Sequence, residues 1–334
     1  MPNWVGDLVM ATPVLTDLRN HFPDAEITAM CKAHLADLLK HDAAIDEIFA
    51  FSQPAYGFLR RAADYNLIGK VRTGQYDLGV LLTNSFSSAW YLFQGRVPKR
   101  LGYRTRMRSF FLTDGIPWPT KKTHQVDFYK QLLEPLGIKK SQTAPRLYLT
   151  AEESKVAKEL LYQRGYVDGA PLFGINPGAA YGSAKCWPKE RFRSLALQLL
   201  DKDPEAFILF FGDAVTEGLV KEIVQDLPER VINLAGATDL RELMSLIQMC
   251  DVLVTNDSGP MHIGAALGVP LVALFGSTDE TLTGPYGQSG SVIRKQVSCA
   301  PCFERVCPID FRCMRGILVE EVVRLAVERR RSRV

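Results

Sequence analysis

The sequence predicts an α/β protein made of two Rossmann-like domains, each with a parallel sheet, that face a cleft. Short apolar runs alternate with helical patterns through most of the chain, and this alternation is typical of βαβ units. It restarts near residue 172, after an amphipathic connecting helix, and 334 residues are long for a single core. Polar turns follow several predicted strands, at the edge where parallel α/β sheets bind ligands.

Composition and charge exclude several other classes. The chain is 47% apolar and 23% charged, which is ordinary for a globular protein. Its net charge of +3 is too small to indicate a nucleic-acid partner. No run approaches the ~18 apolar residues of a membrane-spanning helix. The chain has seven cysteines, which is an odd number, and it does not show the pattern of an export signal. We therefore expect reduced thiols and a cytoplasmic location.

The first predicted domain, residues 1–165, opens on a turn. Residues 1–7 have turn chemistry and lead into an apolar-periodic helix that ends near residue 21. A parallel domain normally has a strand before such a turn, so we expect that the first strand is missing; the alternative is that the turn starts the fold unaided. Strands are then predicted at 26–31, 45–51 and 77–83. Helices are predicted at 33–40, at 56–71, from the polar stretch 84–87 to about residue 93, at 124–136 and, bridging the two halves, at 151–166.

The second predicted domain, residues 166–316, repeats the alternation. A final amphipathic helix at 317–331 belongs to a basic segment, residues 317–334, that we expect to pack back toward the first domain. The strands are predicted at 172–176, 206–211, 231–234, 252–255 and 269–275, and the helices at 189–200, 216–226, 240–250 and from residue 260 onward.

The stretch 251–268 contains the densest set of polar residues. It reads as a buried strand, a polar turn and a helix that begins near Pro260, because proline is favoured at the first helical position. Gly259 allows close approach of a ligand to the backbone, and Ser258 or Asp257 can cap the free amides. Such a turn at a helix N-terminus is a ready anion site. An ordinary strand-to-helix turn is the alternative.

Other polar residues of the second domain follow the ends of neighbouring strands. Lys185 supplies a mobile point charge, which together with a helix N-terminus suits a diphosphate. Asp213 could accept hydrogen bonds from ribose hydroxyls, and Thr238 lies in a further polar turn. His262 could donate to a phosphate or sugar oxygen, or it could be a core-facing histidine. Together these turns suit a ligand that carries a diphosphate and sugar hydroxyls.

In the first domain, Asp7 is the single carboxylate of the opening turn. It could be a helix N-cap, or a general base that projects into the cleft. Clustered basic side chains would suit an acceptor that carries phosphates or carboxylates, although a solvated face is the alternative. Six of them lie at 96–108 in a stretch with loop-like spacing. The acceptor-binding candidates are Arg60, Arg61, Arg100 and Arg104.

Two further patterns remain weaker. Four cysteines at metal-ligand-like spacing within fifteen residues permit a compact structural zinc, although reduced structural thiols are favoured; they are Cys299, Cys302, Cys307 and Cys313. Asp201 and Asp203 resemble a metal-binding DxD but precede Pro204, which indicates an exposed turn. The basic tail 329–333 could touch an anionic membrane.

Taken together, these segments resemble the lipopolysaccharide heptosyltransferases, and the WVGD turn is that of the type II members. The resemblance implies a GT-B fold and an inverting, single-displacement reaction that requires no cofactor and no DxD-bound metal. This chain departs from the family in having no strand before the WVGD turn. The matching segments are residues 2–7, 83–86, 176–179, 184–188, 234–236 and 255–262.

The resemblance also implies substrates and a location. The donor would be ADP-L-glycero-D-manno-heptose, and the acceptor the first heptose of the lipopolysaccharide inner core, as heptosyl-Kdo-lipid A. The enzyme would act as a peripheral protein at the cytoplasmic face of the inner membrane of a Gram-negative bacterium. Alternatives are a related transferase with another heptose acceptor, a non-catalytic nucleotide-sugar-binding module, and an isomerase on the same scaffold.

The resemblance assigns a role to each matching position. Asp7 would be the general base. Lys185 and the amides near Ser258 and Gly259, in the turn that Pro260 ends, would hold the diphosphate. Asp257 and His262 would orient the heptose and its phosphates, and Thr238 would lie near the adenosine.

Overall fold

In a computed structural model the chain divides into two compact units, Met1–Pro145 and Arg146–Val334. Residues 1–53, 58–288 and 290–331 are described. We predicted the division after residue 165, with a helix bridging the halves. The difference arises because that helix, α5 (Ala151–Gln163), packs on α8 (Leu240–Met249) of the second unit.

The second unit is built on one sheet of six parallel strands in the order β11-β10-β9-β6-β7-β8. If the six strands of this unit are numbered 1 to 6 along the chain, the sheet read from β8 has the strand order 3-2-1-4-5-6. This is the strand order of dinucleotide-binding folds. The order therefore reverses between β6 and β9. The strands are β6 (Leu172–Asn176), β7 (Phe207–Phe210), β8 (Val231–Asn233), β9 (Val252–Asn256), β10 (Leu271–Phe275) and β11 (Val292–Arg294).

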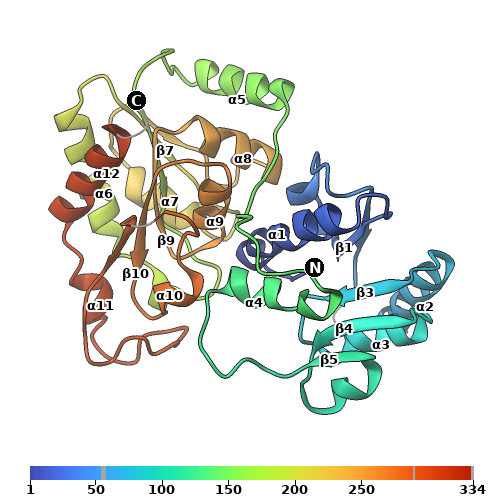
Figure 1. The fold of residues 1–334 in the computed structure, drawn as a ribbon. Coiled ribbons are helices and arrows are strands. Elements are labelled where there is room, and N and C mark those ends of the chain that lie inside the picture. The colour runs from blue at the N-terminus through green and yellow to red at the C-terminus, as the bar shows by residue number, and fades with distance from the viewer. Residues whose placement is uncertain (54–57, 289, 332–334) are drawn as a thin grey trace. The chain divides into compact units, whose positions relative to one another are not determined.

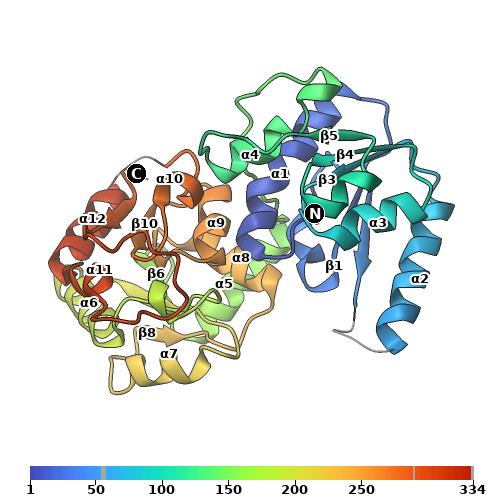
Figure 2. The same ribbon diagram turned by 90° about the horizontal axis from the view of Figure 1, so that it is seen from below.

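Helices cover both faces of this sheet, with α6 (Lys189–Lys202) and α12 (Val319–Arg331) on one side and α8 and α9 (Gly259–Ala266) on the other (Figure 2). Every residue of β6, β7, β9 and β10 is buried, as expected of parallel strands packed on both faces. The five predicted strands are confirmed, and β11 was not predicted. The remaining helices are η4 (Ser183–Lys185), α6 (Lys189–Lys202), α7 (Glu217–Val224), α9 (Gly259–Ala266), α10 (Glu280–Thr283), α11 (Arg312–Arg315) and α12 (Val319–Arg331).

The basic helix α12 buries its apolar face on its own unit, whereas the expected packing was toward the first domain. Val322, Val323 and Ala326 contribute to the core of the second unit, and the helix contacts α6, β9 and β10. Arg330 forms an ion pair with Asp203 at 2.5 Å, so this carboxylate of the DxD-like pair is half-buried. The rest of the basic tail, residues 332–334, lies outside the described residues.

Among its described residues, the first unit contains two separate parallel sheets (Figure 1). Helix α1 precedes the first strand, and the backbone nitrogen of Met1 donates to Met30 O of that strand at 2.7 Å. The strands are β1 (Thr28–Lys32) with β2 (Glu47–Phe51), and β3 (Leu78–Leu81) with β4 (Lys99–Tyr103) and β5 (Asp114–Ile116). The helices are α1 (Val5–His21), η1 (Ala33–Leu39), α2 (Phe58–Thr73), α3 (Phe86–Gln94), η2 (Arg106–Phe111), α4 (Gln125–Gln131) and η3 (Glu134–Leu136).

Two predictions for the first unit need correction. The basic stretch 96–108 is not a loop throughout, because Lys99–Tyr103 forms β4. The last three residues of β4 are buried, but its first two are charged, so the sequence pattern did not indicate a strand. The helix predicted at 33–40 is a 3₁₀ helix. No helix within residues 1–53, 58–288 and 290–331 is long and apolar enough to cross a membrane.

An ion pair joins α5 to α8 within the second unit. Glu153 completes the capping box of α5 with Thr150, and Arg241 of α8 donates to both of its carboxylate oxygens at 2.7 Å. The bonds from Arg241 lower the pKa of Glu153 to about 2, from 4.5. Because the folded-state pKa is the lower one, the pair stabilises the fold fully above pH 4.5, and this contribution is lost as the pH falls toward 2.

We therefore expect Glu153→Gln to lower the free energy of unfolding by about 1–2 kcal/mol at pH 7. Glutamine retains the capping box but not the charge. Urea denaturation measures the unfolding free energy that the variant loses relative to the natural chain. This loss should be less than half as large at pH 3 as at pH 7. The control is Glu152→Gln, which removes an exposed carboxylate from the same turn. An equal deficit at both pH values would contradict the role of the pair.

Candidate active site

The turn between β9 and α9 has the predicted form. Strand β9 ends at Asn256, and α9 begins at Gly259 with Pro260 in its first turn. Ser258 is the N-cap, but its side chain makes no capping hydrogen bond, contrary to the expected role. Its hydroxyl instead accepts from Asn176 Nδ2 at 3.1 Å and lies 3.2 Å from the hydroxyl of Thr255. The first amides of α9 are therefore not capped by this side chain.

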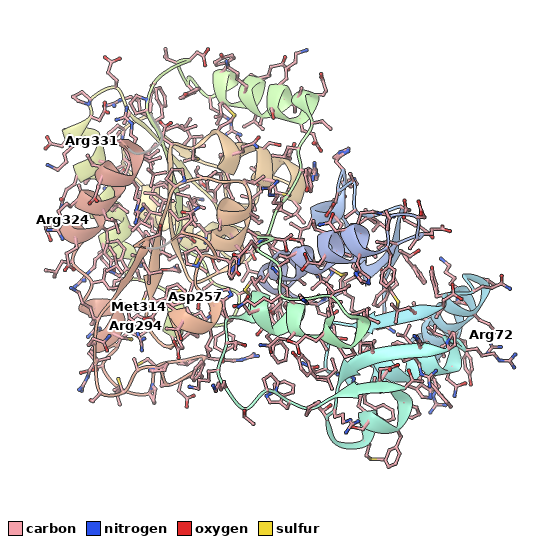
Figure 3. The ribbon with its side chains drawn as sticks, viewed as in Figure 1. Arg72, Asp257, Arg294, Met314, Arg324 and Arg331 are labelled. Carbon is pink, nitrogen blue, oxygen red and sulfur yellow. The ribbon has the colours of Figure 1, made fainter. Side chains whose placement is uncertain are left out.

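Lys185 and Asp257, both predicted donor-site residues, form a buried ion pair. Lys185 Nζ lies 2.5 Å from Asp257 Oδ2, and the two side chains are 12% and 4% exposed. The hydroxyl of Thr278 donates to the same carboxylate oxygen at 2.6 Å. The ring of Tyr181 lies 4.8 Å from the ammonium, which is a favourable cation–π distance. Thr278 lies just before α10 and is bonded to Asp257. Asp257, which is labelled in Figure 3, therefore lies close to the start of that helix.

Two asparagines hold the long turn 177–188 against the turn after β9. Asn256 donates to Pro177 O at 2.7 Å and accepts from the backbone amide of Trp187 at 3.1 Å. Asn176, the last residue of β6, donates to Gly178 O and to the hydroxyl of Thr255 in β9. These bonds cross from β6 to β9, where the strand order reverses and where α/β sheets bind ligands. Neither side chain was among the predicted site residues, although both follow apolar strand patterns.

Ser277 and Thr278, after β10, complete this edge of the sheet and were also missed as site residues. Ser277 is 1% exposed, and its hydroxyl makes no hydrogen bond. Its backbone carbonyl accepts from the amide of Phe303 at 2.8 Å. A buried hydroxyl without a partner is rare and marks a position that a ligand could complete. The signal in the sequence was the Gly-Ser-Thr run directly after an apolar strand.

The cysteine-containing loop lies against the turn that carries Lys185. The hydroxyl of Tyr181 donates to Phe303 O at 2.7 Å, and the amide of Ala184 donates to Arg305 O at 3.0 Å. All seven cysteines are free thiols. Across the described residues, which include all four cysteines of this loop, no group of three or more His, Cys, Asp or Glu side chains is arranged to hold a metal ion. Burial is the main cause that raises the pKa of the Cys313 thiol, and the thiols of the other three raise it further.

A cavity of about 380 Å³ opens beside this loop. Ser183 and Cys186, which flank Lys185, contribute to its wall, but none of the predicted donor-binding residues does. It is lined by Ser183, Cys186, Val306, Cys307, Ile309, Asp310, Phe311 and Arg315.

The other predicted donor-site residues lie in turns of the same unit. Asp213 is exposed and accepts from the amide and the hydroxyl of Thr216, so its carboxylate shapes the turn before α7. Thr238 is half-buried and directly precedes Asp239, the N-cap of α8. His262 is 6% exposed within α9. The structure therefore brings Lys185, Asp257 and Ser258 together and places Asp213 in a local turn.

In the first unit, Asp7 lies in the first turn of α1 and is half-buried. The N-cap of this helix is Trp4, so the alternative that Asp7 is the N-cap is wrong. The hydroxyl of Tyr129 in α4 donates to Asp7 Oδ1 at 3.5 Å, a long hydrogen bond. Burial, and next the negative charge of Asp7, raise the pKa of Tyr129. The residues that follow Asp7, Leu8 to Ala11, are buried and anchor the helix.

The predicted acceptor-binding arginines differ in their surroundings. Arg100 donates to the backbone carbonyls of Val97, Pro98 and Phe111, and so ties the residues before β4 to the last residue of η2. Arg61 and Arg104 are exposed. Arg60 belongs to α2, and its side chain lies outside the described residues.

Comparison with known proteins agrees with this architecture. The model of glycosyltransferase family 9 (heptosyltransferase) matches residues 65–311. Lipooligosaccharide heptosyltransferase 2 of Haemophilus influenzae is 33% identical over 312 residues, which cover 88% of this chain and 86% of that protein. Lipopolysaccharide heptosyltransferase 2 of Escherichia coli is 34% identical over 307 residues, with the same coverage.

A solved structure supports the same assignment. The structure of E. coli ADP-heptose LPS heptosyltransferase II matches with a TM-score of 0.84 and 27% identity, over 99% of this chain and 97% of that one. This likeness confirms the α/β fold class with parallel sheets and the GT-B fold that the resemblance implied. The chain is a glycosyl-transferring enzyme, and it belongs to glycosyltransferase family 9, the heptosyltransferases.

Proposed function

We propose that this chain transfers L-glycero-D-manno-heptose from ADP-heptose to the first heptose of the lipopolysaccharide inner core. The observation that carries the donor half is the cluster of Lys185, Asp257 and Thr278 beside the N-terminus of α9. It lies at the carboxyl ends of β9 and β10, next to the point where the strand order reverses. The relatives named as type 2 heptosyltransferases support the choice of donor and acceptor.

In this proposal the second unit binds ADP-heptose. Lys185 and the free amides of the Ser258–Gly259 turn hold the diphosphate, because an ammonium and a helix N-terminus both attract anions. Asp257 keeps the ammonium in place before the donor arrives, and Thr278 orients that carboxylate. Asp257 and His262 orient the heptose, and Thr238 lies near the adenosine.

The first unit then supplies the acceptor site and the base. Asp7 takes the proton from the acceptor hydroxyl, whose oxygen attacks the anomeric carbon of the donor heptose. The bond from that carbon to the β-phosphate oxygen breaks, and its electron pair leaves with ADP. Attack opposite to the departing ADP inverts the anomeric configuration. No step requires a metal ion, because Lys185 and the helix N-terminus balance the charge that builds on ADP.

We place the reaction at the cytoplasmic face of the inner membrane, because the proposed acceptor is anchored there by its lipid. Basic side chains at the end of α12 support an attraction to anionic lipids, although Arg330 is paired with Asp203.

The test is a transfer assay with purified core acceptors that carry or lack the first heptose. The expected result is ADP release and a heptose-sized mass increase only with the acceptor that carries the first heptose. Transfer to the acceptor without it would assign the chain to another heptosyl step. Binding of ADP-heptose by calorimetry, with no ADP release on any acceptor, would support a non-catalytic binding module instead.

A further inference from the structure

An exposed arginine of the second unit lies close to Lys185. Arg305 belongs to the cysteine-containing loop, residues 299–313, and its Cζ lies 5.3 Å from the ring centroid of Tyr181. Lys185 Nζ lies 4.8 Å from the same centroid, so the two cations are within about 10 Å of each other. Across the described parts of the chain, the guanidinium of Arg305 donates no hydrogen bond and forms no ion pair.

The backbone of Arg305 is fixed against the turn that carries Lys185. Its carbonyl oxygen accepts from the amide of Ala184 at 3.0 Å. A Cβ atom added at Gly182 would lie 2.2 Å from the same oxygen, far inside van der Waals contact, so glycine is needed for this approach. The turn that presents Lys185 therefore also sets the position from which the side chain of Arg305 extends.

The loop is also attached to the turn that follows β10. The amide of Phe303 donates to Ser277 O at 2.8 Å, and the hydroxyl of Tyr181 donates to Phe303 O at 2.7 Å. Ser277 directly precedes Thr278, which belongs to the donor cluster. Residues 303–305 therefore connect the two turns that supply this cluster, although none of them was among the predicted site residues.

The ion pair of Lys185 and Asp257 leaves much of the charge of a diphosphate unbalanced. Lys185 Nζ lies 2.5 Å from Asp257 Oδ2, so the pair as a whole is neutral. The N-terminus of α9 adds a potential equivalent to roughly half a positive charge. Each phosphate of a nucleotide sugar carries a negative charge, and the departing nucleotide carries one more. A further cation beside this pair therefore stabilises both the bound donor and the departing ADP.

The ring of Tyr181 holds the guanidinium of Arg305 in place without using its hydrogen-bond donors. An aromatic face attracts cations, and a planar guanidinium can also stack on it. The N–H groups of the guanidinium remain available for an oxyanion, which they can bind bidentately. Two like charges that share one ring also repel each other, and an anion that contacts both removes this repulsion.

We propose that Arg305 is a second diphosphate-binding residue of the donor site and acts together with Lys185. Its guanidinium donates to phosphate oxygens of the donor and of the ADP product. Tyr181 is a positioning residue, because it acts through the cations that it holds. The inference rests on the proposed function for the identity of the donor, and it extends the donor site to the cysteine-containing loop.

The test variant is Arg305→Gln, which removes the charge and keeps the backbone bonds of the loop. Because the side chain is exposed, the melting temperature should equal that of the natural chain. The matched control is Arg315→Gln, which removes an exposed arginine from α11, where the side chain borders the separate cavity. The probes are ADP and adenosine, and calorimetry on the whole chain measures their affinities.

ADP should bind Arg305→Gln at least about 10-fold more weakly than the natural chain, and Arg315→Gln as tightly. Adenosine has no phosphate and should bind all three proteins equally. Unchanged ADP affinity in Arg305→Gln would overturn the inference and leave the proposed function standing. Equal losses for ADP and adenosine would also overturn it, since Arg305 would then only shape the turn. Absence of ADP binding to the natural chain would contradict both.

Salt dependence separates a charge contact from a structural effect. Added salt should weaken ADP binding less in Arg305→Gln than in the natural chain, and Arg305→Lys, which keeps the charge, should restore the difference. Tyr181→Leu should weaken ADP binding more in the natural chain than in Arg305→Gln, because the ring acts partly through the guanidinium. Equal losses in both backgrounds, with an unaltered salt dependence, would contradict the roles of Arg305 and Tyr181.

Discussion

Asp7→Asn is expected to lower kcat by about 10²- to 10⁴-fold, which is the usual contribution of a general base, while the affinity for ADP stays unchanged. Asparagine has nearly the same shape but cannot take a proton from the acceptor hydroxyl. The helix should remain in place, because Leu8, Val9 and Ala11 anchor α1 in the core of the first unit. The effect should therefore appear in the chemical step alone.

The measurement is single-turnover transfer with saturating ADP-heptose, together with ADP calorimetry on the same protein. Asp24→Asn, which removes an exposed carboxylate just after α1, is the control and should transfer at the full rate. Tyr129→Phe should change kcat by less than about 10-fold, because its hydrogen bond to Asp7 is long. Full activity of Asp7→Asn would rule out this residue as the base.

Lys185→Met should weaken ADP binding by about 10- to 150-fold, because hydrogen bonds to charged groups are worth about 1.5–3 kcal/mol. The methionine fills the same space but removes the ammonium that faces the diphosphate. It also leaves the carboxylate of Asp257 buried without the ammonium and bonded to the hydroxyl of Thr278, so the second unit should lose stability as well. The affinity loss and the stability loss therefore need to be separated.

A double variant makes this separation. Lys185→Met with Asp257→Asn removes both charges of the pair, so the melting temperature should recover toward that of the natural chain. The affinity for ADP should not recover, since the ammonium is still absent. Calorimetry with ADP and thermal denaturation of the single and double variants measure the two effects. If ADP affinity recovered together with stability, Lys185 would be a structural residue and not a ligand of the diphosphate.

The sequence predicted the local framework of the donor site well. The apolar run of β9, the glycine and the proline of the turn place the start of α9 correctly, because strand burial and helix initiation depend on neighbouring residues. The same local reasoning was less reliable in the first unit. Strand β4 begins with charged residues, so its sequence pattern resembles a loop, whereas pairing with β3 and β5 makes it a strand.

Side-chain partners could not be predicted in the same way. The sequence selected Lys185 and Asp257 separately as ligand-binding groups, whereas the fold pairs them with each other and with Thr278. Likewise, Asp213 was selected by its place after a strand, and the structure uses it to bond Thr216 three residues away. Such partners depend on strand order and on the path of each loop, which a linear pattern does not specify.

The sequence by itself therefore determined the fold class, the family and the turn that carries Asp257, because periodicity, glycine and proline act over a few residues. Only the tertiary structure decided which charges are neutralised and which are not. Arg100 and Arg108 look alike in the basic stretch, yet Nε and Nη1 of the first donate to backbone carbonyls, whereas the second is buried with Nε and Nη2 unused. The difference arises because burial and hydrogen-bond satisfaction are set by strands β3 and β4 and helix α3, which meet only in the folded chain.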